Sequence, residues 1–243
     1  MKHPITLIAG PCSAETEQQV MTTATALARH GITIFRAGIW KPRTRPGNFE
    51  GVGVAGLPWL QRVQHELGMR VVVEVGTPAH VEAALKAGVD MVWIGARTSA
   101  NPFAVQAVAE ALRGSDIPVL VKNPINPDLS LWLGAIERLA LQQVTHLSAV
   151  LRGFSCYGPS LYRNPPLWEI ALELRRQMPQ LPILCDPSHI CGRRDLIADV
   201  CRQAFDHGLD GLMIESHCTP DAAWSDAAQQ VTPDDLAQIL ADL

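Results

Sequence analysis

The chain has 243 residues, which is enough to bury a large hydrophobic core in one domain. Its net charge of -4 and its 18% of charged residues disfavour general binding to nucleic acid or to an anionic membrane, so any basic cluster must be local. No apolar stretch reaches the roughly 20 residues of a membrane span, and the first residues lack the apolar region of a signal peptide, so we expect a cytoplasmic protein.

Short runs rich in Val, Ile and Leu alternate along the chain with stretches of helical period. Eight runs are predicted strands: ITLIAG (5–10), ITIFRAG (32–38), RVVVEVG (70–76), DMVWIGA (90–96), PVLVKN (118–123), HLSAVLRG (146–153), LPILCD (181–186) and DGLMIES (210–216). A helix-like stretch such as EQQVMTTATALARHG or TPAHVEAALKAG follows each run. Several of these stretches end in a glycine that predicts a left-handed C-terminal cap: Gly31, Gly68, Gly88 and Gly208.

Eight strand–helix units predict an α/β fold, a single (β/α)8 barrel over residues 1–243. No linker or change of composition indicates a second domain. The alternative is a doubly wound open sheet. It is disfavoured because no GxGxxG motif follows the first predicted strand.

The carboxyl ends of the predicted strands carry reactive side chains, and in a barrel these ends form one face. In chain order they offer Cys12, Arg36 with the Lys41 loop, Glu74, Arg97, Lys122, Arg152, Asp186 with His189, and Glu215 with His217. Charges that converge on a low-dielectric core repel one another unless anions or a metal lie between them. The pattern therefore predicts a polyanionic ligand with more than one phosphate or carboxylate group.

A metal site is predicted from Cys12, His189 and Glu215, together with Asp226 in the loop after the last strand. Taken singly, a buried Cys or a His in a turn more often has a structural role. Barrel closure, however, makes the first and last strands neighbours. One thiolate, one imidazole and two carboxylates suit Mn, Fe, Co or Zn with an open position, which implies Lewis-acid chemistry.

Eight segments in order carry a family resemblance: AGPCSAE, KPRTRPGNFEG, GART, KNP, LRGF, DPSHICGRRD, MIESH and SDAAQQ. The chain resembles the type I 3-deoxy-D-arabino-heptulosonate 7-phosphate (DAHP) synthases from Ile8 to about Val231. It is most similar to the compact subgroup whose synthase domain is sometimes fused to chorismate mutase. These enzymes condense phosphoenolpyruvate with erythrose 4-phosphate to give DAHP and phosphate, the entry step of the shikimate pathway. Pro124 departs from the pattern, because many relatives have Gly there.

The resemblance implies two adjacent substrate sites. Erythrose 4-phosphate would be held by Lys41, Pro42, Arg43 and Thr44. Phosphoenolpyruvate would be held by Arg36, Arg97, Lys122 and Arg152, with Glu74 and the Ala96 backbone. The metal would polarise the aldehyde for attack by C3 of phosphoenolpyruvate, and water would then add at C2 before phosphate leaves by carbon–oxygen cleavage. Lys122 would stabilise the developing charge, and Lys41 or His189 would move protons.

Two alternative functions are weighed. The related 3-deoxy-D-manno-octulosonate 8-phosphate synthases use arabinose 5-phosphate, but their loop has an Asn-Arg pattern where this chain has Pro-Arg-Thr. The other alternative is a non-catalytic barrel that only binds a phosphorylated metabolite. Such a barrel would have lost a metal ligand or a phosphate contact, and none is missing from this sequence.

The resemblance also implies a homo-oligomer, either a dimer or a tetramer. Because the barrel begins and ends close to the ends of the sequence, we expect no ferredoxin-like or chorismate mutase domain, and feedback only through a partner protein.

The six cysteines contain no zinc-type CxxC pair, so they are expected to be free thiols. Cys156 and Cys191 are interpreted as tolerated small residues, and Cys12 or a nearby thiol is expected to oxidise when the site is empty.

Overall fold

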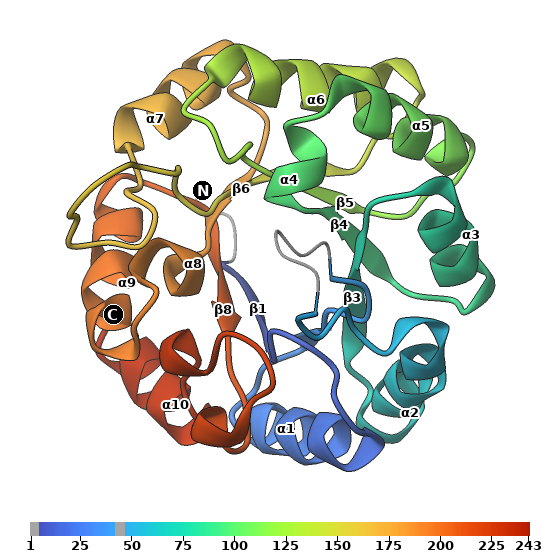
Figure 1. Cartoon of the computed structure of the whole chain (residues 1–243), viewed down its shortest axis with the longest axis vertical. Helices are drawn as coiled ribbons and strands as arrows, with labels where there is room; N and C mark the ends of the chain where they lie inside the picture. Colours follow the sequence, from blue (N-terminus) through green and yellow to red (C-terminus); the bar gives the residue numbers. More distant parts are fainter. Residues whose placement is uncertain (1–4, 42–46) are drawn as a thin grey trace.

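The computed structural model describes residues 5–41 and 47–243, and in this part of the chain eight parallel strands close into a barrel inside a ring of helices (Figure 1). The strands are β1 (Thr6–Gly10), β2 (Ile34–Arg36), β3 (Arg70–Val75), β4 (Met91–Ile94), β5 (Val119–Lys122), β6 (Leu147–Leu151), β7 (Ile183–Cys185) and β8 (Gly211–Glu215). All eight predicted strands are confirmed, and the open-sheet alternative is wrong.

The helices follow the strands in regular alternation, and two strands are followed by a short additional helix at the carboxyl end. The helices are α1 (Glu17–Arg29), α2 (Leu57–Leu67), α3 (Pro78–Lys86), α4 (Ala96–Ser99), α5 (Pro102–Leu112), α6 (Leu129–Leu141), α7 (Trp168–Gln177), α8 (Pro187–Cys191), α9 (Ile197–Asp206) and α10 (Pro233–Ala241). The predicted glycines after α1, α2, α3 and α9 all have the left-handed φ, between 65° and 79°.

Closure of the barrel is made by β1, which pairs in parallel with both β2 and β8. Ile8 lies opposite Ile34 on one side and opposite Met213 on the other. The same register places Gly10 opposite Glu215. The chain therefore brings its first and last strand ends together, as the predicted metal site requires.

The inside of the barrel is filled by apolar side chains that alternate along the strands with residues packed against the helices. The inner cluster is Ile8, Ile34, Val72, Met91, Trp93, Leu120, Val150, Leu184 and Met213. Two positions further along, six of these strands place a charged residue: Arg36, Glu74, Lys122, Arg152, Asp186 and Glu215. Because a strand repeats every two residues, these charged side chains form the layer directly above the apolar one.

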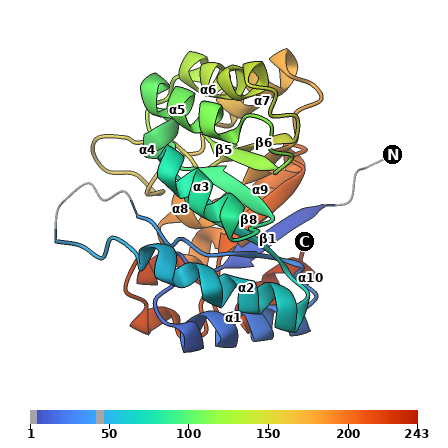
Figure 2. The ribbon, with the colours of Figure 1, turned by 90° about the vertical axis from the view of Figure 1, so that its right-hand side faces the viewer.

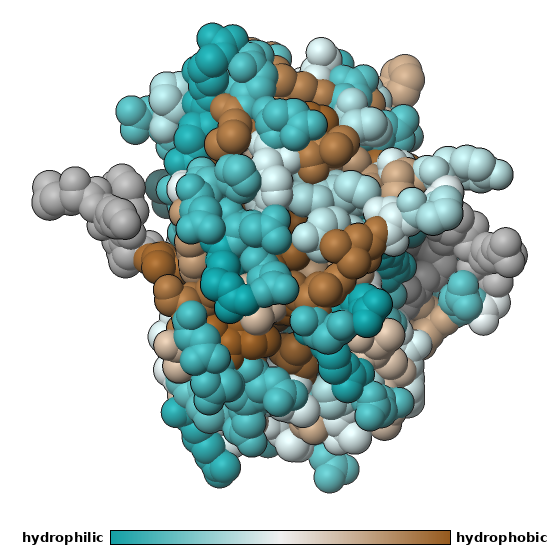
Figure 3. All heavy atoms as spheres, turned by 90° about the vertical axis from the view of Figure 1, so that its left-hand side faces the viewer, coloured by the Kyte–Doolittle hydropathy of each residue, from teal (hydrophilic) through white to brown (hydrophobic). Residues whose placement is uncertain are grey.

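The loops that follow the strands lie at one end of the barrel. Figure 2 shows the loop between β6 and α7 projecting at this end, on the left, with the C-terminus and the start of β1 toward the other end. The side formed by α7 and α9 carries polar residues interspersed with apolar ones (Figure 3). Within the described residues, no helix is both long and apolar enough to cross a membrane.

Candidate active site

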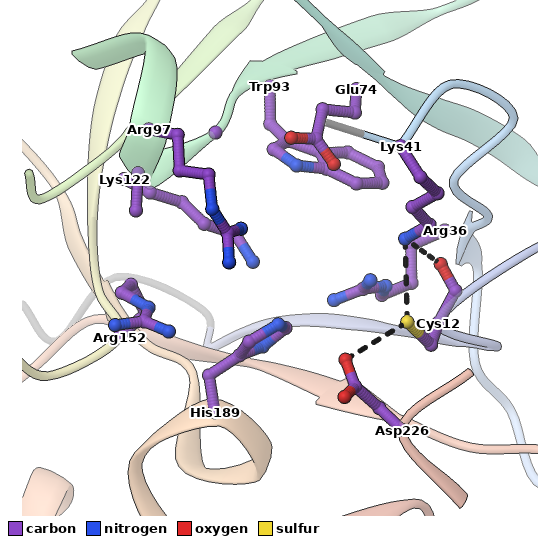
Figure 4. A pocket seen from close by; sticks show the side chains of 12 residues that line it. Cys12, Arg36, Lys41, Glu74, Trp93, Arg97, Lys122, Arg152, His189 and Asp226 are labelled. Atoms are coloured by element: carbon purple, nitrogen blue, oxygen red, sulfur yellow. Dashed lines mark hydrogen bonds between the residues drawn. The ribbon is translucent and has the colours of Figure 1, made fainter. Parts of the chain in front are cut away.

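A polar cavity that is open to solvent lies at the carboxyl ends of the strands (Figure 4). Its lining is formed by Cys12, Arg36, Lys41, Glu74, Trp93, Gly95, Ala96, Arg97, Lys122, Arg152, His189 and Asp226. Ten of these were predicted from the sequence. Glu215 is fully buried against the site, with Arg36 and His189 as neighbours. The predicted residues Pro42, Arg43 and Thr44 lie outside the described part of the chain.

The Arg36 guanidinium is anchored by the carboxylate of Glu215. Their Nη2 and Oε1 atoms are 3.0 Å apart, and both side chains are almost completely buried. Burial disfavours the charged form of Glu215, but His189 and Arg36 hold its pKa below the ordinary value. Arg36 Nε and Nη1 are buried without a hydrogen-bond partner among the described residues. These donors remain available to an anion in the cavity.

A second buried ion pair joins Lys122 to Asp186, with Nζ and Oδ2 2.6 Å apart. Burial lowers the pKa of Lys122. Burial also opposes ionisation of Asp186, yet His189 and Lys122 hold the pKa of this carboxyl well below its usual range. The sequence marked Asp186 as a strand-end charge but not as the partner of Lys122. Its role here is to fix the ammonium group at the edge of the cavity.

Positive side chains converge on one side of the cavity, where Arg97, Lys122 and Arg152 point toward a common space (Figure 4). Burial lowers the pKa of Arg152 to about 10, and the neighbouring arginines, among them Arg97, act in the same direction. The guanidinium is still charged at neutral pH. Three cations that share this space, of which Lys122 is paired with Asp186, are suited to a phosphate or carboxylate ligand.

Trp93 lies against two of the cations, Arg36 and Lys122, and sequence reasoning missed it. Its ring lies 4.9 Å from the Arg36 guanidinium carbon and 5.7 Å from Lys122 Nζ. Both distances are within cation–π range. The alternation of inward-facing residues in β4 was the signal that could have identified it, because Trp93 follows Met91 on the same face.

The opposite side of the cavity holds a cluster of potential metal ligands. One ligand atom each from Cys12, Glu215 and Asp226 lies within 4.8 Å of the other two. Cys12 Sγ and Asp226 Oδ2 are 3.4 Å apart. The fourth predicted ligand, His189, lies outside this tight group, with Nε2 3.8 Å from Glu215 Oε1. Its ring points into the same cavity (Figure 4).

The donor set fits a divalent transition metal. A thiol and two carboxylates combine a soft ligand with hard ones, a mixture that Mg²⁺ sites rarely use. Burial lowers the pKa of His189, so its ring is neutral and keeps a lone pair for a metal. His189 Nδ1 lies 2.8 Å from Asp186 Oδ2, in contact though not aligned as a hydrogen bond. A carboxylate behind the ring is the usual support of a metal-binding histidine.

The protonation of Cys12 limits when a metal can bind. Burial, together with the charge of Glu215, raises the pKa of this thiol to about 11. A metal must therefore displace a proton at neutral pH. Lys41 Nζ lies 3.4 Å from the Cys12 sulfur and also donates to the Cys12 carbonyl oxygen. Gly38 leaves room for this ammonium group, because a Cβ there would overlap it.

Glu74 approaches the cavity from β3, between Lys41 and Trp93 (Figure 4). Its position depends on Gly95, the residue after β4. A Cβ at Gly95 would overlap the Glu74 carboxylate, so only glycine permits this close approach.

Two glutamines that sequence reasoning did not assign support the metal-ligand cluster from the loop after β8. Gln230 Oε1 accepts a hydrogen bond from the backbone N–H of Cys12 at 3.0 Å. Gln229 Nε2 donates to Glu215 Oε2 at 2.6 Å. Both belong to the segment SDAAQQ, whose resemblance to known proteins was visible but whose contacts with distant strands were not.

His217 and the remaining cysteines lie apart from the cavity lining. His217 Nδ1 accepts a hydrogen bond from the backbone of Thr219 at 2.8 Å, and Nε2 lies 3.5 Å from Glu15 Oε2. All six cysteines are free thiols, with Cys156 exposed and Cys191 buried. The predicted oxidation of Cys12 or a neighbouring thiol in the empty site stays a prediction.

Comparison with known proteins places the chain in context. A family model described as "DAHP synthetase I family" matches residues 1–242. The chain is 34% identical over 230 residues to a phospho-2-dehydro-3-deoxyheptonate aldolase of Thermotoga maritima, a match that covers 93% of this chain and 65% of the relative. It is 28% identical over 264 residues to a 2-dehydro-3-deoxyphosphooctonate aldolase of Vesicomyosocius okutanii, covering 100% of this chain and 91% of the relative.

Two solved structures of DAHP synthases are also similar to this chain. The crystal structure of the Thermotoga maritima DAHP synthase superposes with a TM-score of 0.88 at 31% identity, covering 98% of this chain and 68% of the other. A truncated form of a Thermotoga maritima synthase superposes with a TM-score of 0.84 at 28% identity, covering 98% and 84%. The chain thus spans about two thirds of the full-length Thermotoga relative.

Proposed function

The chain belongs to the DAHP synthetase I family, and from this premise we propose that it condenses phosphoenolpyruvate with erythrose 4-phosphate to give DAHP and phosphate. One observation carries the proposal. A cluster of cations and a cluster of potential metal ligands face each other across a single cavity (Figure 4). This arrangement suits two phosphorylated substrates, one of which needs its carbonyl polarised.

The cationic side would bind phosphoenolpyruvate. Arg97, Lys122 and Arg152 would hold its phosphate and carboxylate, and Arg36 would contribute Nε and Nη1, which have no hydrogen-bond partner among the described residues. The indole of Trp93 lies against Arg36 and Lys122. Because buried ion pairs hold Lys122 and Arg36, little reorganisation of these two cations is needed as negative charge develops on the departing phosphate. Lys122, held by Asp186, is the residue best placed to stabilise that charge.

The opposite side would hold a divalent transition metal, Mn, Fe, Co or Zn, through Cys12, His189, Glu215 and Asp226. Such an ion supplies Lewis-acid polarisation of the erythrose 4-phosphate aldehyde, which prepares it for attack by C3 of phosphoenolpyruvate. Ala96 and Glu74 also line the cavity and would complete the phosphoenolpyruvate site.

Erythrose 4-phosphate would extend from the metal-ligand side toward the loop after β2. Of the residues assigned to it, Lys41 lies within the described part of the chain, and Pro42, Arg43 and Thr44 do not. The Lys41 ammonium group and the neutral His189 ring both face the cavity (Figure 4). Lys41 would donate a proton during addition of the aldehyde and, once deprotonated, accept one from the water that adds, because the lone pair of His189 would be bound to the metal.

Assembly belongs to the same proposal. We expect a homo-oligomer, a dimer or a tetramer, and light scattering on the purified protein measures this directly. Feedback by aromatic amino acids is expected only in the presence of a partner protein. Titration of Phe, Tyr, Trp, chorismate and prephenate into a steady-state assay of the chain alone tests that expectation.

The substrate assignment is tested by offering two sugar phosphates to the same preparation. The Mn²⁺-loaded protein is mixed with phosphoenolpyruvate and either erythrose 4-phosphate or arabinose 5-phosphate, and the loss of enol absorbance and the release of phosphate are followed. We expect consumption with erythrose 4-phosphate. Consumption with arabinose 5-phosphate instead would assign the octulosonate reaction. Binding of phosphoenolpyruvate without consumption in either mixture would indicate a non-catalytic barrel.

A further inference from the structure

The loop between β6 and α7 reaches the metal-ligand cluster through Arg163, which neither the sequence motifs nor the comparisons assign. Arg163 Nη1 donates to Asp226 Oδ1 at 3.0 Å and to Gln229 Oε1 at 2.7 Å. One guanidinium nitrogen thus joins two residues of the loop after β8. Its side chain is 49% exposed, whereas that of Asp226 is 19% exposed.

The Asp226 backbone explains why such a contact is needed. Asp226 has φ 50° and ψ 35°, a left-handed backbone conformation that residues other than glycine adopt at a cost in free energy. A residue held in this conformation needs surrounding contacts that over-determine it. The hydrogen bond from Arg163 fixes one carboxylate oxygen and leaves the other, Oδ2, directed to Cys12 Sγ at 3.4 Å.

The second contact of Arg163 extends to another ligand. Gln229 is 1% exposed, accepts from Arg163 through Oε1 and donates to Glu215 Oε2 through Nε2 at 2.6 Å. The orientation of this amide is therefore determined at both ends. Glu215 in turn directs Oε1 toward Arg36 and His189. Arg163 is therefore connected to Asp226 directly and to Glu215 through Gln229.

The next residue, Asn164, holds the segment that carries His189. Its side-chain Nδ2 donates to the His189 carbonyl oxygen at 2.7 Å, and its backbone N–H donates to the Ile190 carbonyl oxygen at 3.0 Å. The stem of Arg163 packs against Gly192, where a Cβ would lie 2.5 Å from Arg163 Cβ. The pair is thus seated closely on the end of α8.

We propose that Arg163 and Asn164 act as a clamp that sets the relative positions of Asp226, Glu215 and His189 for metal binding. The proposal rests on the metal centre proposed above. It assigns positioning roles, not catalytic ones, because neither residue lines the cavity. Partners that orient metal ligands usually contribute about 10–100-fold to metal affinity, and we expect about 10-fold for the half-exposed Arg163.

The test compares Arg163→Ala with Arg62→Ala. Arg62 is a matched control, because its side chain is 46% exposed and it also joins two side chains, Glu17 and Glu66, away from the cavity. The affinity of each full-length variant for Mn²⁺ and Co²⁺ is measured by competition with a chelator, and the thermal unfolding of the metal-free protein is recorded. We expect Arg163→Ala to bind each metal about 10-fold more weakly than the wild type, and Arg62→Ala to bind normally.

The possible outcomes separate the clamp from the metal centre. Wild-type affinity in Arg163→Ala overturns the clamp alone. A wild-type protein that binds neither metal overturns the proposed centre and the clamp with it. A loss of affinity that scales with lost stability of the metal-free protein, equally in both variants, assigns Arg163 a merely structural role and also overturns the clamp.

A double-mutant cycle tests the path through Gln229. If Arg163 acts on Glu215 by orienting this amide, Arg163→Ala should weaken metal binding less in a Gln229→Leu background than in the wild type. Independent effects of the two substitutions would contradict that path.

Discussion

The inside of the barrel contains two layers that are made by the same strands and differ completely in character. Leu120 lies in the apolar layer and Lys122, two residues later, in the charged layer. Val72 and Glu74, and Met213 and Glu215, repeat the pattern on other strands. The same strands thus position both layers, although only the lower one contributes hydrophobic stabilisation.

The difference shows how one scaffold can combine stability with a site for anions. Full burial of one large apolar side chain contributes about 1.5–3 kcal/mol, whereas taking an ion pair out of water costs more than many pairs return. The charged layer is therefore expected to contribute less to stability than the apolar layer below it. What it gains is a set of charged groups that need no rearrangement when a ligand arrives.

The largest expected effect is on activity alone and comes from Cys12→Ala. Removing the thiol should abolish tight metal binding and lower turnover by at least about 10³-fold, because a bound metal supplies several kcal/mol of transition-state stabilisation. Thermal unfolding of the metal-free variant should change little, since the substitution stays small and apolar. Turnover at the wild-type rate would show that the metal-ligand cluster has no part in the reaction.

Asp186→Asn removes the negative member of a buried ion pair in the charged layer. It leaves Lys122 buried without its carboxylate, and we expect a loss of about 3 kcal/mol in the free energy of unfolding at neutral pH. It should also lower the pKa of Lys122 beyond the lowering already caused by burial. If Lys122 acts in its protonated form, as proposed, the alkaline limb of the kcat/KM profile at saturating metal should move to lower pH. An unmoved limb would separate Lys122 from catalysis.

The lowered pKa of Lys122 also determines how the free energy of unfolding changes with pH. Between the lowered pKa of folded Lys122 and its ordinary value in the unfolded chain, the folded state binds fewer protons. The Lys122 contribution to stability therefore rises with pH through this window, and the window should be wider in Asp186→Asn. Denaturant unfolding of wild type, Asp186→Asn and Lys122→Met at several alkaline pH values isolates this contribution. Without a difference between wild type and Lys122→Met in pH dependence, the lowered pKa would be wrong.

Leu120→Ala tests the apolar layer and should give the opposite signature. A cavity between the strands should reduce the free energy of unfolding by about 2–3 kcal/mol. At a temperature where the variant is folded, metal affinity and kcat should stay near the wild-type values. A large loss of kcat in the folded variant would mean that the two layers are not separable.

Trp93→Phe should have the smallest effect, because it keeps an aromatic ring at this position. Trp93 belongs to both layers. It packs in the inner cluster and also faces Arg36 and Lys122. Replacing the indole by a smaller ring should cost about 1 kcal/mol of stability and about a fivefold increase in the KM for phosphoenolpyruvate, with kcat retained. An increase in the KM for the sugar phosphate alone would place the indole on the other side of the site.

The sequence allowed accurate prediction of the fold because each strand is a short apolar run of the correct period, and the glycine caps mark the helix ends. Lys122 and Arg152 were predictable as site residues because the end of a barrel strand fixes where a side chain points. Gln229 and Arg163 were not, since both lie in irregular loops whose hydrogen bonds join residues far apart in the chain. Nothing local distinguishes them from surface residues.

The proposed reaction depends most on the metal, and removal and restoration of the metal test it most directly. Purified protein is first analysed for bound elements, then stripped with a chelator and assayed with phosphoenolpyruvate and erythrose 4-phosphate. We predict that stripped protein is inactive and that Mn²⁺, Fe²⁺, Co²⁺ or Zn²⁺ restores condensation, whereas Mg²⁺ does not, because the cluster includes the Cys12 thiolate. Full turnover in excess chelator would contradict the proposed role of the metal.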